Sequence, residues 1–404
     1  MTTQIILLIL LVGGAIISAA LIKVLLERLS LPAIVGYIIL GFCIRLFDAE
    51  LGFLTEQVEQ TIDFLAYAGV TVLLFRVGLE SKLHKLLQQL GKASAIGLVC
   101  IAVSGATGFI CAYWFIHLEL LTSLVIGTAL TATSVGMVAA VWEDSGAIKT
   151  SEGQLLLDIA EFDDIMGVVL MVLLFNIAPI IAARNVEAIG GTLLKTGAIF
   201  AIKLIVFSLL CIMFAMYIEK PLTKFFQRIE KPPEFTLVVV SIGFVIAALA
   251  GLMGFSLAIG AFFAGLIFSR DPSSIKSKTA FDVIYDLFAP FFFIGIGLNV
   301  RLESLTPALL PAAVLVAAAF TGKFLGSAGP ALYCQHFKPA LLLGLSMVPR
   351  AEVAMIITQR STNLADNVMP DRVFTAMVIT CLATCIIPPI VLKKAIPRWL
   401  EILK

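Results

Sequence analysis

The chain has 404 residues, of which 60% are hydrophobic and 14% are charged, and its mean hydropathy is +1.06. Soluble domains are about half apolar and about a quarter charged, so this composition excludes a soluble globular protein. It predicts an all-α polytopic membrane protein that is surrounded by lipid. The formal net charge is only +1, and we expect no nucleic-acid partner.

Cysteine and histidine usage indicates no cofactor. The seven cysteines lie in or at the ends of apolar runs without a C-x-x-C spacing, which is typical of reduced core residues. The three histidines are scattered, whereas a metal centre needs two or more such ligands at set spacings. We therefore expect neither a cofactor nor a transition-metal site.

Apolar windows along the sequence predict about 13 membrane-spanning helices. The first follows an N-terminus that carries no basic residue, which favours a transmembrane helix over a cleaved signal peptide. In chain order, the predicted helices cover residues 4–22, 31–47, 62–79, 93–116, 121–142, 154–182, 192–218, 234–252, 255–270, 280–298, 306–334, 340–360 and 371–392.

The connections between these helices alternate in their basic content. With the N-terminus placed outside, the inside connections hold 18 Lys and Arg residues and the outside connections hold 5. Cytoplasmic connections of membrane proteins carry the excess of basic residues. The pattern predicts an external N-terminus and a cytoplasmic C-terminus.

Matched glycines indicate an internal repeat. The members of three pairs are separated by 224, 224 and 219 residues. The pairs are Gly36 with Gly260, Gly41 with Gly265, and Gly78 with Gly297. The shift is seven helices, an odd number, so the two copies would have opposite orientations in the membrane. Inverted repeats of this kind mark secondary transporters.

Two adjacent aspartates, Asp163 and Asp164, lie within the predicted helix 154–182. Asp164 would lie roughly 16 Å into that helix, near the bilayer midplane. A charged side chain there costs roughly 2.5–3.5 kcal/mol on insertion scales, and carboxylates in such positions usually mark ion or proton pathways.

Three other predicted helices place polar residues at the same depth. These residues are Thr131, Thr133, Ser134, Lys323, Pro349, Arg350 and Glu352. Exposing all of them to lipid would be prohibitive, so we expect the four helices to face one another or a wet cavity.

Helix geometry suggests different roles for the two aspartates. Neighbouring helical side chains point about 100° apart, so Asp163 and Asp164 cannot both face one cavity squarely. One is expected to pair with Lys323 and the other to face water. Asp158, Glu161 and Asp164 are spaced by three, which predicts an acidic path along one face from the cytoplasmic surface.

A hard cation such as Na⁺ prefers oxygen ligands. The carboxylate of Asp164, the hydroxyls of Thr131, Thr133 and Ser134, backbone carbonyls and water could supply them. The sequence therefore predicts Na⁺ at Asp164. Two plainer interpretations stay open: hydroxyls in membrane helices often serve packing, and the aspartates could belong to a structural ion-pair network.

Two of the predicted helices carry signals of interruption. Pro349 removes a backbone donor, and the Thr-Ala-Thr-Ser run ending at Ser134 competes for backbone hydrogen bonds. Broken helices at matching positions of two repeats point to the binding site of a transporter. Arg350 and Glu352 would neutralise the half-helix dipoles, a supporting role that we favour over direct contact with the ion.

With these residues in place, the chain resembles the monovalent cation:proton antiporters of bacteria, specifically the sodium/proton exchangers with paired aspartates. The likeness covers nearly the whole chain in order. It rests on Leu31-Pro-Ala-Ile-Val-Gly36-Tyr, Leu-Leu-Phe75 with Gly78-Leu-Glu80, Thr131-Ala-Thr133-Ser134, Phe162-Asp163-Asp164, Gly322-Lys323 and Pro349-Arg350-Ala-Glu352-Val.

The resemblance implies that Asp164 carries the ion or proton, while Asp163 pairs with Lys323 on a facing helix. It also implies a six-helix core that moves against a dimerisation domain, and hence a homodimer in the bacterial inner membrane. By position, residues 1–92 and 219–304 would form the dimerisation helices, 93–190 and 305–404 the core transport helices, and 191–218 a linker helix.

The Kef-type potassium systems are near relatives with a similar membrane domain. They carry Gln before the transporting aspartate and append a nucleotide-binding domain, whereas this chain has Asp163 and ends soon after its last predicted helix. Both features point away from Kef-type regulation, while K⁺ as substrate and a regulatory domain outside this sequence stay open. Two further departures are Arg76, at a site that is apolar in most relatives, and Ala351, where many have Gly.

The predicted function is secondary active antiport rather than enzymatic catalysis. Na⁺ or Li⁺ would compete with H⁺ for Asp164, and only the loaded forms would neutralise the site enough to cross. If Lys323 releases a proton when Asp163 engages the ion, the exchange is electrogenic. The alternatives are a K⁺/H⁺ antiporter of the same fold and a sodium-coupled organic-anion symporter. An intramembrane aspartyl protease is disfavoured, because it needs carboxylates on separate helices.

Overall fold

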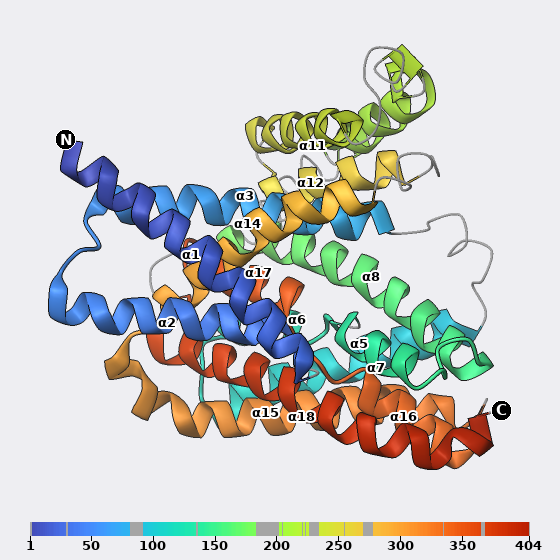
Figure 1. Ribbon diagram of the computed structural model, residues 1–404. Coiled ribbons are helices and arrows are strands. Elements are labelled where there is room, and N and C mark those ends of the chain that lie inside the picture. Colours follow the sequence, from blue (N-terminus) through green and yellow to red (C-terminus); the bar gives the residue numbers. More distant parts are fainter. Residues whose placement is uncertain are drawn as a thin grey trace. The chain divides into compact units, whose positions relative to one another are not determined.

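The computed structural model describes residues 2–29, 31–80, 92–134, 136–182, 202–203, 205–219, 221–222, 224–225, 234–253, 255–269, 278–333, 335–364 and 368–403. Within these ranges every regular element is helical (Figure 1). The elements are α1 (Thr2–Arg28), α2 (Ala33–Leu51), α3 (Glu56–Glu80), α5 (Lys92–Ile110), η1 (Cys111–Phe115), α6 (Leu120–Ala129), α7 (Gly136–Asp144), α8 (Ser151–Ala182), η3 (Phe214–Ile218), α11 (Glu234–Leu252), α12 (Leu257–Phe268), α14 (Lys278–Leu298), α15 (Leu302–Ala331), α16 (Phe337–Ser346), α17 (Glu352–Ser361) and α18 (Asp371–Leu403).

The predicted class, an all-α protein with many membrane spans, is confirmed. Seven described helices are long and apolar enough to cross a bilayer, and five shorter apolar helices accompany them. The total of 13 stays a prediction, and the first part of the predicted helix 192–218 lies outside the described residues.

The chain divides into two compact units. Unit 1 comprises Met1–Ala20, Asp48–Lys82 and Asn185–Gly295, and unit 2 comprises Leu21–Phe47, Leu83–Arg184 and Ile296–Lys404. Unit 2 therefore holds all of the polar residues that the sequence singles out at mid-membrane depth.

In unit 1, α3 and α12 are in backbone contact through one glycine each. A Cβ at Gly78 would overlap the carbonyl of Phe262, and a Cβ at Gly265 would overlap the carbonyl of Phe75. Small residues allow membrane helices to approach this closely. At one end of α3, Arg76 donates to Glu80 at 2.9 Å and lies 4.5 Å above the ring of Tyr285, so this departure from the family pattern has partners.

An equivalent contact occurs within unit 2. Gly297, at the end of α14, packs against the carbonyl of Ile38 in α2, as Gly78 packs against that of Phe262 in unit 1. Ile38 and Phe262 are 224 residues apart, the separation found between the matched glycines. The recurrence supports the predicted repeat, while the opposite orientation of its copies in the membrane stays a prediction.

Unit 2 is built around close packing of α5 against α15. A Cβ at Gly322 would lie 3.0 Å from the Cα of Ser104, and one at Gly326 would lie 2.9 Å from the Cα of Cys100. Only glycine permits this approach without displacing a backbone. The contact holds Lys323, which lies on α15 beside Gly322, in the interior of the unit.

Two helical paths of unit 2 are interrupted, as the sequence predicts. α6 ends at Ala129 and α7 begins at Gly136, while α16 ends at Ser346 and α17 begins at Glu352. α6 and α16 are both ten residues long, and their first residues are 217 positions apart. The predicted spans 121–142 and 340–360 are thus each two half-helices, with non-helical backbone at residues 130–134 in the first and 347–351 in the second.

Candidate functional site

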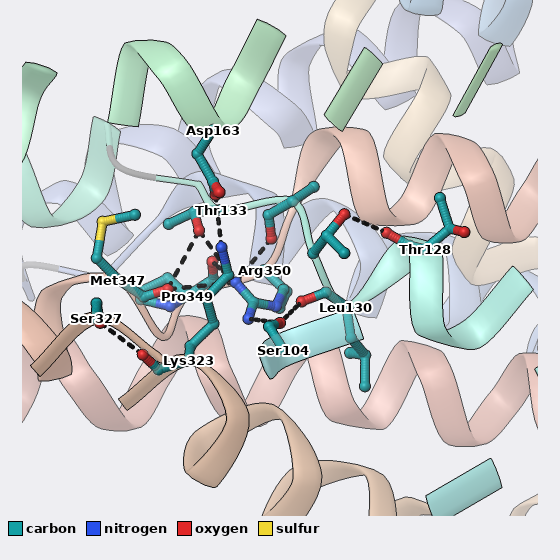
Figure 2. A network of polar contacts seen from close by, with 12 residues as sticks. Ser104, Thr128, Leu130, Thr133, Asp163, Lys323, Ser327, Met347, Pro349 and Arg350 are labelled. Carbon is teal, nitrogen blue, oxygen red and sulfur yellow. Dashed lines mark hydrogen bonds and ion pairs between the residues drawn. The ribbon is translucent and has the colours of Figure 1, made fainter. Parts of the chain in front are cut away.

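The two interruptions lie against each other. The amide nitrogen of Ser134 donates to the carbonyl of Pro349 at 2.9 Å. The hydroxyl of Thr133 donates to the carbonyl of Met347 at 3.3 Å (Figure 2). Backbone groups at membrane depth need partners inside the protein or water. These contacts give the irregular segments partners where the helical bonds are missing.

The side chain of Arg350 joins both breaks. It is fully buried, its Nη1 donates to the carbonyl of Ala132 at 2.7 Å, and the carbonyl oxygens of Met347 and Pro349 lie 3.3 and 3.4 Å from the same nitrogen (Figure 2). These carbonyls follow the C-terminal ends of α6 and α16, where unsatisfied C=O groups carry partial negative charge. One guanidinium therefore compensates the ends of two half-helices.

Glu352 performs the complementary task at the start of a half-helix. It is the first residue of α17, and its Oε2 accepts from the hydroxyl of Ser134 at 2.6 Å. A carboxylate at a helix N-terminus is stabilised by the helix dipole. Ser134 and Glu352 therefore tie the first break to the beginning of α17.

Asp163 and Lys323 form a buried ion pair between α8 and α15. Lys323 Nζ lies 2.7 Å from Asp163 Oδ2, and neither side chain exposes any surface (Figure 2). Among the described residues, the other carboxylate oxygen, Asp163 Oδ1, has no hydrogen-bond partner. Removing charges from water is costly, and an opposite charge in direct contact offsets that cost.

Asp164 has a different environment from its neighbour. Its side chain is half-buried, while that of Asp163 is fully buried. Successive helical side chains diverge by about 100°, so the contact of Asp163 with α15 turns Asp164 away from Lys323. Asp158 and Glu161, which would form the acidic path, are also half-buried on α8.

One turn beyond Asp163, α8 meets both broken helices at Gly167. A Cβ at this position would lie 3.5 Å from the Cβ of Ala132 in the first break and 3.7 Å from a methyl group of Val353 in α17. The helix that carries the two aspartates is therefore packed directly against the crossing, by which we mean the two non-helical segments 130–134 and 347–351 that contact each other.

The predicted hydroxyl ligands are all buried and already donate hydrogen bonds within the protein. Thr131 donates to the carbonyl of Thr128 at 2.7 Å, while Thr133 and Ser134 donate to Met347 and Glu352 as described above. A hydroxyl that donates its proton keeps lone pairs with which it can accept. Thr133 uses one of them for the guanidinium of Arg350, at 3.3 Å.

Sequence reasoning missed several residues that support the crossing. Ser104 of α5 donates to the carbonyl of Leu130 and lies 3.5 Å from Arg350 Nη2. Two residues of α18 bind the backbone of Arg350. The hydroxyl of Thr384 accepts from the amide of Arg350 at 3.2 Å, and the thiol of Cys385 donates to the carbonyl of Arg350 at 2.9 Å. In the sequence, Ser104 and Thr384 are small polar residues within apolar helices. Such residues usually serve helix packing, so they did not indicate contact with Arg350.

An all-helical bundle with apolar spans and two broken helices crossing beside a buried Asp–Lys pair defines a secondary transporter rather than an enzyme. The sequence matches the transmembrane sodium/hydrogen exchanger family over residues 16–395, and the chain belongs to that family.

Two relatives and one solved structure illustrate the match. The high-affinity Na⁺/H⁺ antiporter NhaS3 of Synechocystis is 26% identical over 94% of this chain and 82% of its own length. The Na⁺/H⁺-K⁺ antiporter GerN of Bacillus cereus is 27% identical over 91% of this chain and 90% of its own. The sodium proton antiporter MjNhaP1 of Methanocaldococcus jannaschii shares the fold, with a TM-score of 0.70 and 16% identity over 99% of this chain and 98% of that one.

Proposed function

We propose that the protein exchanges Na⁺ or Li⁺ for H⁺ across a bacterial cell membrane, with ion and proton competing for Asp164. The relatives reported above are antiporters by name, which supports cation/proton exchange. The observation that carries the site assignment is the ion pair of Asp163 with Lys323, because it makes Asp163 the charge partner of the lysine, while the neighbouring Asp164 lies half-buried on the same helix.

Charge at the crossing supports a monovalent load. Two buried cations, Lys323 and Arg350, face two anions, Asp163 and Glu352, and these four charges cancel. Asp164 is a further carboxylate beside these four groups, and as an anion it would carry one negative charge. A single Na⁺ or a single proton neutralises it, whereas the empty site keeps a charge that is costly to move through a low-dielectric barrier. Because the loaded site crosses more easily than the empty one, the protein would exchange Na⁺ for H⁺ without letting either ion pass alone.

The stoichiometry depends on Lys323. If the bound cation draws Asp163 away from its partner, the ammonium group loses its stabilising neighbour and can release a proton. Two protons would then move against each Na⁺, and exchange would be electrogenic. Removing the ammonium in Lys323→Gln should abolish the voltage sensitivity of currents recorded on solid-supported membranes. Unchanged currents would contradict this role.

We also propose an elevator-type motion for alternating access. In this proposal residues 93–190 and 305–404 are the moving core, 1–92 and 219–304 the dimerisation helices, and 191–218 the linker, with a homodimer as the working form. The N-terminus lies outside and the C-terminus in the cytoplasm. The 18-to-5 bias of basic residues and the recurring glycine contacts support this arrangement.

A K⁺/H⁺ antiporter of the same fold is the second candidate. It is favoured by the similarity to GerN, whose name includes K⁺. The oxygen ligands at the crossing suit either ion.

Cation preference is measured with purified protein in proteoliposomes that contain a pH-sensitive dye. The expected result is dye dequenching after addition of Na⁺ or Li⁺, with a weaker response to K⁺ and none to an organic anion. A response to K⁺ alone would establish the second candidate. A response that requires an organic anion would overturn antiport.

A further inference from the structure

The last helix, α18, is longer than a membrane span. It contains 33 residues and at ~1.5 Å per residue reaches about 50 Å, whereas the hydrocarbon core is about 30 Å thick. If the span begins near Asp371, it ends near Ile390. The residues from Lys393 onward then lie at the depth of the lipid headgroups, whichever side of the membrane they face.

This end of α18 is amphipathic. Leu392 and Ile396 are buried in an apolar cluster of unit 2, and Trp399 packs against the same cluster. The side chains of Lys393, Lys394 and Arg398, on the remaining surface of the helix, are exposed.

The neighbouring start of α16 extends the basic surface. Lys338 is exposed, and its Nζ lies 5.9 Å from the ring centre of Trp399. Figure 1 shows α16 beside the C-terminal part of α18. Next to Lys338, Tyr333 and Phe337 are 94% and 65% exposed. Exposed aromatic residues beside basic ones are typical of the boundary between hydrocarbon and headgroups.

We propose that these four side chains, Lys338, Lys393, Lys394 and Arg398, form a basic rim that binds the phosphate headgroups of anionic phospholipids. At this end of unit 2, Glu143, Asp144 and Glu152 lie on α7 and α8, and Glu401 is the one acidic residue in the sequence between Lys393 and Leu403, so basic residues outnumber acidic ones along this part of α18. Clustered Lys and Arg beside a membrane span attract anionic headgroups, and each basic side chain adds to the attraction.

The rim is coupled to the crossing by packing. The apolar cluster that holds Leu392 and Ile396 also contains Trp142 of α7 and Met347 of the second break. Trp142 donates to the hydroxyl of Ser346, the last residue of α16, at 3.0 Å. A headgroup that holds the rim in place therefore stabilises the helices behind the crossing.

The test uses the tryptophan at the rim. In the Trp114→Phe variant, the remaining tryptophans are Trp399 and the fully buried Trp142. The protein is reconstituted in phosphatidylcholine vesicles that contain increasing fractions of brominated phosphatidylglycerol or brominated phosphatidylcholine. We expect half-maximal quenching at a roughly threefold lower fraction of the anionic lipid, and loss of that preference in about 0.5 M salt. Additional Trp399→Phe should remove the difference.

Charge variants decide whether the rim is responsible. Replacing all four rim residues with Gln should equalise the two lipids. The double variant Lys338→Gln/Arg398→Gln should reduce the preference, while its matched control on α1, Lys23→Gln/Arg28→Gln, should keep it. If the fourfold variant does not fold, Lys338→Gln and Arg398→Gln singly should each reduce the preference.

Equal quenching in the starting protein, or an unchanged preference in the rim variants, would overturn the proposal. So would displacement by soluble glycerol phosphate, which would indicate a site for free anions. Lipid binding is measured without a cation gradient, so its failure leaves the antiport proposal untouched.

Discussion

Asp163 and Lys323 illustrate how much depends on a single contact at the residue scale. Both side chains are fully buried, and the lysine nitrogen is 2.7 Å from the carboxylate oxygen. A buried charge that loses its partner is left without water and without compensation. Loss of either partner is therefore expected to destabilise the protein, in addition to its effect on the proposed exchange.

The first prediction concerns this pair. Asp163→Asn and Lys323→Gln should each lower the free energy of unfolding by about 3–5 kcal/mol, because each leaves one buried charge. The double variant should lose less than the sum of the single variants, since it leaves no charge. Thermal unfolding in detergent measures all three. Strictly additive losses would show that the two groups do not interact.

The second prediction concerns Arg350. Lys in its place keeps the charge, but its side chain is one bond shorter and lacks the second nitrogen that lies 3.5 Å from the Ser104 hydroxyl, so at least one contact of the guanidinium is expected to be lost, at a cost of about 1–3 kcal/mol. Arg350→Lys should unfold at a lower temperature and transport more slowly. Arg372→Lys, an exposed position on α18, is the matched control and should leave both quantities unchanged. Equal behaviour of the two variants would contradict the role given to the guanidinium.

At the element scale, the close approach of α5 and α15 positions Lys323 for its partner on α8. Gly322 and Gly326 allow that approach, whereas a Cβ at Gly329, also on α15, would have no atom within 4 Å. On α15, a side chain at Gly326 would therefore collide with α5, whereas one at Gly329 would not.

The third prediction uses this difference. Gly326→Val should separate α5 from α15, reduce the thermal stability and slow exchange, because its side chain would meet the backbone of Cys100. Gly329→Ala should keep or slightly raise the stability, since alanine is the better helix former. Unfolding midpoints of the two variants in the same detergent provide the comparison. A Gly326→Val protein as stable as the parent would show that the helices do not pack this tightly.

The same scale shows what the sequence could predict. Both interruptions follow from local signals, Pro349 in one helix and Thr-Ala-Thr-Ser in the other, and the structure contains both. Pairing of one aspartate with Lys323 follows from their common depth, and the structure shows the contact with Asp163. The support from Ser104, Thr384 and Cys385 was not predictable, because it depends on which helix faces which. That choice is made by tertiary packing rather than by local pattern.

At the scale of the whole molecule, the distribution of basic residues predicts the orientation in the membrane. The fourth prediction is that Lys338→Cys is labelled by a membrane-impermeant maleimide only from the cytoplasmic side, and Arg301→Cys only from outside. Both positions are exposed, and both variants are made in a background without the native cysteines. The reverse pattern would invert the topology, and labelling of both from one side would contradict the helix parity.

Asp164 is the residue on which the proposed exchange depends, and its removal is the most direct test. In proteoliposomes, uptake of radioactive Na⁺ driven by an outward proton gradient should be abolished by Asp164→Asn, in a protein whose unfolding midpoint is unchanged. Asp158→Asn, on the same helix, should slow uptake without abolishing it. Retained proton-driven Na⁺ uptake in the Asp164→Asn protein would contradict the account.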